Sequence, residues 1–121
     1  MNNYNFKEMS KEEILEVLKS NPWFLKDIED EEIQLEAVKE YGNAIQYIHN
    51  PSEDTQLEAV KQDGFNIRYI HNPSKEIQLE AVKENGLAIQ FINNPSEAVQ
   101  LAAVKQDEYM LFSSLITPVN Q

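Results

Sequence analysis

The sequence predicts an all-α fold, a right-handed-type α-solenoid of about five helix-turn-helix repeats. A 22-residue pattern recurs four times in register across residues 31–118, without a gap. No segment alternates polar and apolar residues with the period of two that is typical of a strand. Because self-similarity at a fixed period of about 20–50 residues is typical of repeat architectures, these observations favour a one-dimensional stack of helical units.

The four regular units differ at few positions. The first three read EEIQLEAVKEYGNAIQYIHNPS, EDTQLEAVKQDGFNIRYIHNPS and KEIQLEAVKENGLAIQFINNPS, and the fourth reads EAVQLAAVKQDEYMLFSSLITP. A degraded copy precedes them at an offset of 20 residues, because the Asn-Pro of the junction is missing. We therefore expect an N-terminal extension at 1–9, a degenerate N-terminal capping repeat at 10–30, four repeats at 31–118, the last acting as the C-terminal cap, and a tail at 119–121.

The first helix of each unit is predicted to run for about ten residues. A serine after the junction proline suits its N-cap, and Ser10 with Glu13 forms a capping box. Acidic residues crowd the first turn, where they complement the helix dipole. Glycine is then expected to end the helix, because it adopts the left-handed C′ conformation without strain. The residues concerned are Gly42, Gly64 and Gly86.

The second helix is predicted to be short, for example Phe65 to His71, and partly 3₁₀, because so short a helix is marginal alone. An Asn-Pro pair ends it, since proline excludes the α conformation from the preceding residue. The side chains of Asn50, Asn72 and Asn94 are expected to hydrogen-bond local backbone in this turn.

Neither helix can bury its apolar stripe alone, so we expect stacking to bury three columns of side chains. The columns are Leu35, Leu57, Leu79 and Leu101; Val38, Val60, Val82 and Val104; and Ile45, Ile67, Ile89 and Leu111. The end units should differ from the middle because they close the stack. The N-terminal unit has Pro22, Trp23 and Phe24, and the C-terminal unit has Glu108 in the glycine column and Ser114 in an isoleucine column.

The string QLEAVKxxGxAIQYIxNPS resembles uncharacterised short α-helical repeats found in bacterial, phage and large-virus proteins. More distantly, it is similar to variant leucine-rich repeats, which alternate an α-helix with a 3₁₀ helix, and to HEAT-like repeats. The resemblance extends from Ser10 to Pro118. It implies an α-solenoid and no particular activity, because such folds carry many different binding functions.

The chain carries a net charge of −11, from 21 acidic and 10 basic residues. A field of this sign repels phosphate backbones and anionic lipid. We therefore expect a basic protein as partner, and neither nucleic acid nor a membrane. The sequence has no cysteine, no apolar run near the roughly 20 residues of a membrane span, and a polar N-terminus without a signal-peptide core. These features predict a cytoplasmic protein, in the host cytoplasm if a phage encodes it.

Two polar columns recur in the regular units. The first, the glutamine ladder, is interpreted as structural, with amides that hydrogen-bond the neighbouring turn, although a ladder facing a ligand is the alternative. It consists of Gln34, Gln56, Gln78 and Gln100. The second, the lysine ladder, has a glutamate three residues before each of its first four members, which predicts a solvated, salt-bridged face. It consists of Lys19, Lys39, Lys61, Lys83 and Lys105.

Candidate partner-binding residues surround the aromatic column of the second helix. The flanking units place Asp27 and Ser113 in this column, so stacking does not require an aromatic ring there. Aromatic residues and arginine are enriched at interfaces, and packing between successive short helices is the competing interpretation. No metal set is expected, because Asn93 replaces a third histidine. The candidates are Gln46, Tyr47, His49, Arg68, Tyr69, His71, Gln90 and Phe91.

The sequence contains no phosphate-binding glycine loop, no nucleophile signature and no zinc-binding helix motif, so we expect no enzyme, metal or cofactor. The first hypothesis is a non-catalytic protein-protein interaction module that presents an acidic solenoid surface. One alternative is a phage-type inhibitor or acidic nucleic-acid mimic that binds a basic host or defence protein. Another is a structural element that forms a homodimer through its end caps, using Phe112, Leu115 and Ile116.

Overall fold

The computed structural model describes residues 4–107, and all regular structure in this range is helical. The predicted all-α solenoid is confirmed. The α-helices are α1 (Lys11–Ser20), α2 (Glu31–Glu40), α3 (Glu53–Gln62), α4 (Lys75–Glu84) and α5 (Glu97–Gln106). The 3₁₀ helices are η1 (Phe6–Glu8), η2 (Pro22–Asp27), η3 (Gly42–Tyr47), η4 (Gly64–Tyr69) and η5 (Gly86–Phe91).

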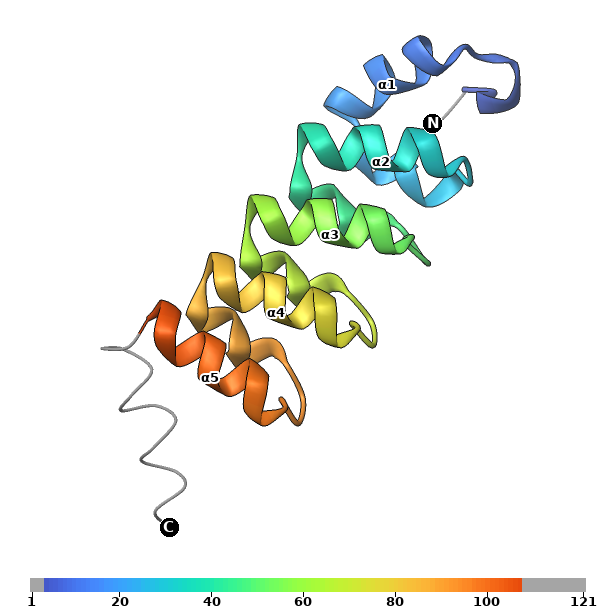
Figure 1. Ribbon diagram of the computed structural model, residues 1–121. Coiled ribbons are helices and arrows are strands. Elements are labelled where there is room, and N and C mark those ends of the chain that lie inside the picture. Colours follow the sequence, from blue (N-terminus) through green and yellow to red (C-terminus); the bar gives the residue numbers. More distant parts are fainter. Residues whose placement is uncertain (1–3, 108–121) are drawn as a thin grey trace.

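The units stack side by side to form two layers (Figure 1). The α-helices form one layer, which we call the α layer, and η2–η5 form the other, the 3₁₀ layer. Helices α2–α5 begin 22 residues apart, whereas α1 begins 20 residues before α2. Helix α1 is also tilted relative to α2, and the helices from α2 to α5 turn gradually along the stack (Figure 1). The first joint between units therefore differs from the others.

The helix starts follow the capping pattern predicted from the sequence. Ser10 Oγ accepts a hydrogen bond from the N–H of Glu13, and Glu13 Oε1 accepts one from the N–H of Ser10, which completes the capping box. Serine hydroxyls at the starts of α3, α4 and α5 accept from the N–H three residues later. Asp30 performs the same function for α2. Each α-helix therefore begins at a fixed residue of its unit.

The prediction that glycine ends each α-helix in a left-handed conformation is wrong. All three glycines lie in the described part of the chain, and none has a positive φ. Each glycine is the first residue of a 3₁₀ helix, and the residue before it is the extended C-cap. Glycine is needed instead for close packing: a Cβ on Gly64 would overlap the carbonyl oxygen of Ala81 in the next unit. A Cβ on Gly42 would lie 2.8 Å from Asn66 Nδ2 and 2.9 Å from Gln62 Oε1.

The second helix is 3₁₀ throughout, and η4 is both earlier and shorter than the predicted range 65–71. The left-handed conformation expected of glycine occurs in the junction instead, at Asn72 (φ 53°) and Asn94 (φ 50°). Asparagine tolerates this region better than most residues. The side chains of Asn50, Asn72 and Asn94 form no hydrogen bond among residues 4–107, so that part of the prediction is wrong.

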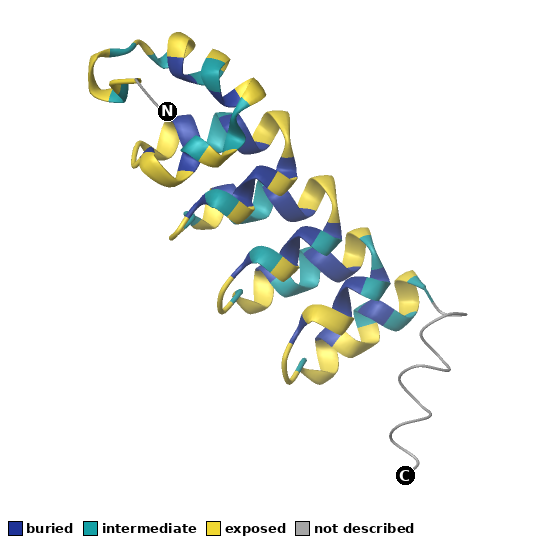
Figure 2. Ribbon diagram, turned by 180° about the vertical axis from the view of Figure 1, so that it is seen from behind, coloured by how far each residue is buried: buried dark blue, intermediate teal, exposed yellow. Residues whose placement is uncertain are grey.

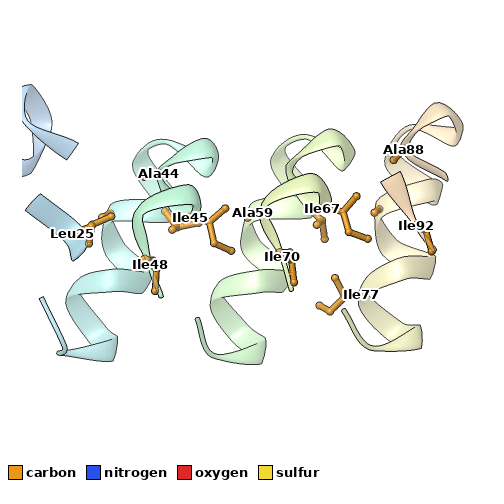
Figure 3. Packing of buried hydrophobic residues seen from close by; sticks show 14 of the residues in the cluster. Leu25, Ala44, Ile45, Ile48, Ala59, Ile67, Ile70, Ile77, Ala88 and Ile92 are labelled. Carbon is orange, nitrogen blue, oxygen red and sulfur yellow. The ribbon is translucent and has the colours of Figure 1, made fainter. Parts of the chain in front are cut away.

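The core lies between the two layers and continues from unit to unit. The valine column is confirmed as buried at Val38, Val60 and Val82, while Val104 in the last described helix is only partly buried. Ile45, Ile67 and Ile89 of the isoleucine column are also buried. A further set recurs at the same place in successive units, as Figure 3 shows for Ile48, Ile70 and Ile92. The junctions between units are largely exposed (Figure 2).

The leucine column is not buried as predicted. Its first three members are half-buried, and Leu101 is 58% exposed. The buried face of α2 contains Ile33, Ala37 and Val38. Leu35 lies about 200° around the helix from Ile33, at about 100° per residue. Its side chain therefore points away from the face that contacts the 3₁₀ layer.

Aromatic residues cluster at the N-terminal end of the stack. The rings of Tyr4 and Phe6 lie 5.6 Å and 5.7 Å from the ring of Phe24, measured between centroids. Trp23 lies beside Phe24, at 6.1 Å, and is half exposed. These contacts attach the segment before α1 to η2. The residues predicted to form the C-terminal cap, including Glu108, Leu111, Ser114, Phe112, Leu115 and Ile116, lie outside the described residues.

Candidate functional site

Charged residues are divided unequally between the two layers. Helices α1–α5 contain most of the acidic residues of the chain, whereas η3, η4 and η5 contain none. Arg68 is the one charged residue in these three 3₁₀ helices. The acidic surface and the candidate partner-binding residues therefore lie on different sides of the molecule.

The leucine row is a feature of the α layer. We use this name for Leu35, Leu57, Leu79 and Leu101, together with Leu15 in the same column of the first unit. Leu35 and Leu57 border a shallow depression of about 220 Å³ between α2 and α3. Asp54, Glu58 and Lys61 also line it. Apolar and charged side chains of successive units therefore meet on this surface.

The lysine ladder shares the α layer with the leucine row. Lys19 Nζ lies 3.5 Å from Glu16 Oε1, so one of the predicted helical ion pairs forms. The lysines of α2, α3 and α4 form no such pair with the glutamate three residues before them. A second pair joins α1 to α2, with Lys11 Nζ at 3.5 Å from Glu32 Oε1. Exposed pairs of this kind contribute about 0–1 kcal/mol, so most charges of the layer can contact a partner.

The glutamine ladder is used by the fold itself. Each side-chain Nε2 donates to the backbone carbonyl of the junction that precedes its own helix. The distances are 2.7 Å from Gln34 to Ile28, 3.0 Å from Gln56 to Pro51, 3.1 Å from Gln78 to Pro73 and 3.0 Å from Gln100 to Pro95. Only Gln34 is fully buried, and exposure increases toward α5. These bonds attach each α-helix to the preceding turn.

Three of the candidate partner-binding residues form one cluster on the 3₁₀ layer. The Arg68 guanidinium lies 4.7 Å from the centroid of the Tyr69 ring and 6.0 Å from that of Phe91. Arg68 Nη2 also donates to Tyr69 Oη at 2.9 Å. The Phe91 ring contacts Phe65 edge-on at 5.6 Å between centroids. Phe65 was not among the predicted residues, because its column contains Asn43 and Leu87 in the neighbouring units. Tyr47 is half-buried one unit away.

The remaining candidates are separate from this cluster. Gln46 Nε2 donates to the carbonyl of Asn43, and Gln90 Nε2 donates to the carbonyl of Leu87, each within its own 3₁₀ helix. His49 and His71 are exposed in the junctions that follow η3 and η4. Among residues 4–107, no group of three or more metal-ligating side chains is placed to hold a metal ion.

The joint between α2 and α3 is closed by one side chain, Gln62. Its Oε1 accepts a hydrogen bond from the N–H of Gly42 at 2.8 Å. Its Nε2 donates to the carbonyl oxygens of Val38 at 2.7 Å and Lys39 at 3.1 Å. The amide therefore hydrogen-bonds both the carbonyl groups at the end of α2 and the first N–H of η3.

The joint between α1 and α2 contains a hollow of about 380 Å³. It lies between α1, from Glu12 to Lys19, and the C-terminal half of α2, beside η2 and η3. Apolar and charged side chains both line it, among them Leu15, Leu25, Ala37 and Tyr41. Nothing in the sequence pattern predicts this hollow.

No helix within residues 4–107 combines the length and the apolar character needed to cross a membrane.

A family model described as a domain of unknown function, DUF4116, matches the chain over residues 10–51 and again over residues 52–95. The chain belongs to this family. Each DUF4116 match covers two successive helical units and begins at a serine N-cap, Ser10 or Ser52. The first match includes the shortened unit at 10–30, so this unit is part of the family pattern. Neither the curated proteins nor the solved structures contain a match to the chain.

Proposed function

We propose that this DUF4116 protein is a non-catalytic protein-protein interaction module that binds a basic protein segment along its α layer. The observation that carries the proposal is the leucine row. The same apolar residue recurs in each regular unit at a position that the stacking of units leaves partly open. Exposed apolar surface bordered by charged residues is typical of interaction sites, and Leu101, at 58%, is the most exposed member of the row.

The charges around the leucine row determine the kind of partner. A glutamate follows the leucine directly in three regular units, as in Glu36, Glu58 and Glu80. Acidic residues also outnumber lysines on α1–α5. A basic segment would be steered to this layer by long-range attraction, which mainly raises the association rate.

The spacing of the units suits a helical partner. Neighbouring packed helices lie about 8–10 Å apart, which sets the distance between successive leucines. Seven residues of an α-helix span about 10 Å. An amphipathic helix with an apolar residue at every seventh position therefore matches the row, and this is an established mode of peptide recognition.

The test compares the two layers. Affinity capture from native lysate would identify a partner, which is then purified and titrated against three forms of the full chain. These are the wild type, a Leu57→Ser, Leu79→Ser variant and an Arg68→Ala, Phe91→Ala variant as the control on the 3₁₀ layer. We expect at least tenfold weaker binding for the leucine variant, little change for the control, and weaker wild-type binding as salt increases.

The opposite ranking would overturn the proposal. If the Arg68→Ala, Phe91→Ala variant loses the partner and the leucine variant keeps it, the 3₁₀ layer is the binding surface. Binding that is insensitive to salt would remove the electrostatic part. The nucleic-acid mimic is less well supported, because the lysine ladder interrupts the carboxylates of the α layer. Sedimentation analysis at several concentrations would test the self-association alternative.

A further inference from the structure

The hollow between α1 and α2 lies at the described joint where proline takes the place of glycine, whereas the second change, glutamate for Gln62, also occurs at the α3–α4 joint as Glu84. Aligning this joint with the next one places Pro22 in the column of Gly42 and Glu40 in the column of Gln62. Proline has no N–H to donate to the side chain of residue 40. A carboxylate has no hydrogen to donate to the carbonyls at the end of α1. Neither half of the Gln62 arrangement can therefore form.

Steric effects add to the lost hydrogen bonds. At the regular joints, glycine lets the next unit approach so closely that a Cβ at Gly42 or Gly64 would overlap its atoms. Pro22 carries a ring at this place, so α2 cannot approach α1 in the same way. The tilt of α1 in Figure 1 and the hollow agree with this difference.

The wall and the border of the hollow have different chemistry. Its apolar wall includes Leu18, Leu25 and Ala44, which are buried within the fold. Its border carries four carboxylates and two lysines, and Lys19 is already paired with Glu16. The carboxylates belong to Glu12, Glu16, Glu36 and Glu40. The opening is therefore apolar inside and predominantly anionic outside.

We propose that this hollow receives one large apolar side chain of a basic protein segment, with lysine or arginine residues of that segment against Glu12, Glu36 and Glu40. The inference rests on the proposed function and adds where the partner is anchored. A volume of about 380 Å³ lies within the range of pockets that bind ligand groups, about 300–1,000 Å³. Leu15 belongs both to the leucine row and to the hollow, so a segment along the row reaches this site.

The closing experiment converts the first joint into a regular one. In the variant Pro22→Gly, Glu40→Gln, positions 22 and 40 match Gly42 and Gln62 of the α2–α3 joint. The new side-chain amide at position 40 can then hydrogen-bond the backbone of the first unit, and we expect the hollow to close. A random peptide library displayed on particles is selected against the wild-type full chain, and the selected peptides are titrated by fluorescence anisotropy. Glu84→Gln, the same charge change in the same column at a distant joint, is the control.

The inference predicts selected peptides with one large apolar residue flanked by lysine or arginine. Their affinity should fall at least tenfold with the closed-joint variant and remain unchanged with Glu84→Gln. Peptides without this pattern, or peptides that bind the closed-joint variant equally well, would overturn the inference. If the partner binds wild type through the leucine row and is unaffected by joint closure, the proposed function stands and the anchor site is wrong.

Two further outcomes remain decisive if the closed-joint variant does not fold. The variant Glu12→Lys, Glu36→Lys reverses two charges at the border of the hollow and leaves its apolar wall unchanged, and it should weaken binding of the same peptides at least tenfold. Unchanged binding would overturn the assignment of a basic partner. If the wild-type chain is a dimer and the closed-joint variant is a monomer, the hollow is occupied by a second copy of the chain. This result would also contradict the inference.

Discussion

The backbone N–H of Gly42 donates a 2.8 Å hydrogen bond to Oε1 of Gln62, a side chain of the following unit. The same amide donates to two carbonyls at the end of α2. A glutamine is required for this arrangement, because the site needs an acceptor and a donor on one short side chain. The α2–α3 joint is thus held by polar contacts as well as by apolar packing.

Replacing Gln62 with glutamate should destabilise the protein by about 1–3 kcal/mol, since two carbonyls lose their donor and a carboxylate faces them. The free energy of unfolding, measured by urea titration with circular dichroism, tests this. Gln90→Glu is the matched control, because Gln90 is exposed and donates only within its own 3₁₀ helix. Equal effects of the two substitutions would contradict the function assigned to Gln62.

Gly64→Ala should cost more stability than Gly42→Ala. The added Cβ at Gly64 meets the backbone of Ala81, which cannot move without shifting α4. At Gly42 it meets the side chains of Gln62 and Asn66, which can adopt other rotamers. We expect about 1–3 kcal/mol at Gly64, as for other overpacked sites. Thermal unfolding of both variants tests which substitution lowers stability more. A larger loss of stability for Gly42→Ala would show that contact with the Ala81 backbone does not determine the cost.

Asn72→Ala should destabilise by about 1–2 kcal/mol, because alanine lacks the local polar side chain that helps asparagine adopt a left-handed φ. Asn72→Gly should be neutral or slightly stabilising. Asn50→Ala, in the same column of the previous unit, is the control, since Asn50 has no positive φ. The prediction fails if unfolding by urea shows the same loss for Asn50→Ala as for Asn72→Ala.

Asn66 is the one buried asparagine of the described 3₁₀ layer, and substitutions at this position test its function in the fold. Its Nδ2 donates to the carbonyl of Ala59 at 2.9 Å, and its side chain is buried. Asn66→Asp should cost several kcal/mol, about 3 or more, because a buried carboxylate would face that carbonyl. Asn66→Ala should cost less, since Ala44 and Ala88 occupy this column in neighbouring units. Calorimetric unfolding of both variants checks this, and a greater loss of stability for Asn66→Ala than for Asn66→Asp would contradict the prediction.

Much of the fold was predictable because it depends on local chemistry. The solenoid, the serine N-caps and the buried valine and isoleucine columns follow from short-range patterns that each unit repeats. Glycine was misassigned for a specific reason. A glycine after a helix is compatible with a left-handed turn and with close packing, and only the position of the next unit, at Ala81 for Gly64, distinguishes them.

The candidate surfaces were harder to predict than the fold. Whether Leu35 is buried depends on the direction from which the 3₁₀ layer contacts α2, and one unit alone does not contain this information. The cluster of Arg68 with Tyr69 and Phe91 joins two units, so it depends on the stacking geometry. The hollow at the first joint requires the column alignment of Pro22 and Glu40 together with the tilt of α1. None of these follows from helix propensity or hydrophobic period.

The irregular joint between α1 and α2 has a consequence for binding register. A stack of near-identical units has translational symmetry, so a long partner could shift by one unit and form nearly the same contacts. The 20-residue spacing occurs at one joint of the described chain and removes this symmetry. A partner that contacts this joint therefore has one preferred register and one preferred direction along the stack. The number of regular units could then change without changing the unit at which the bound partner starts.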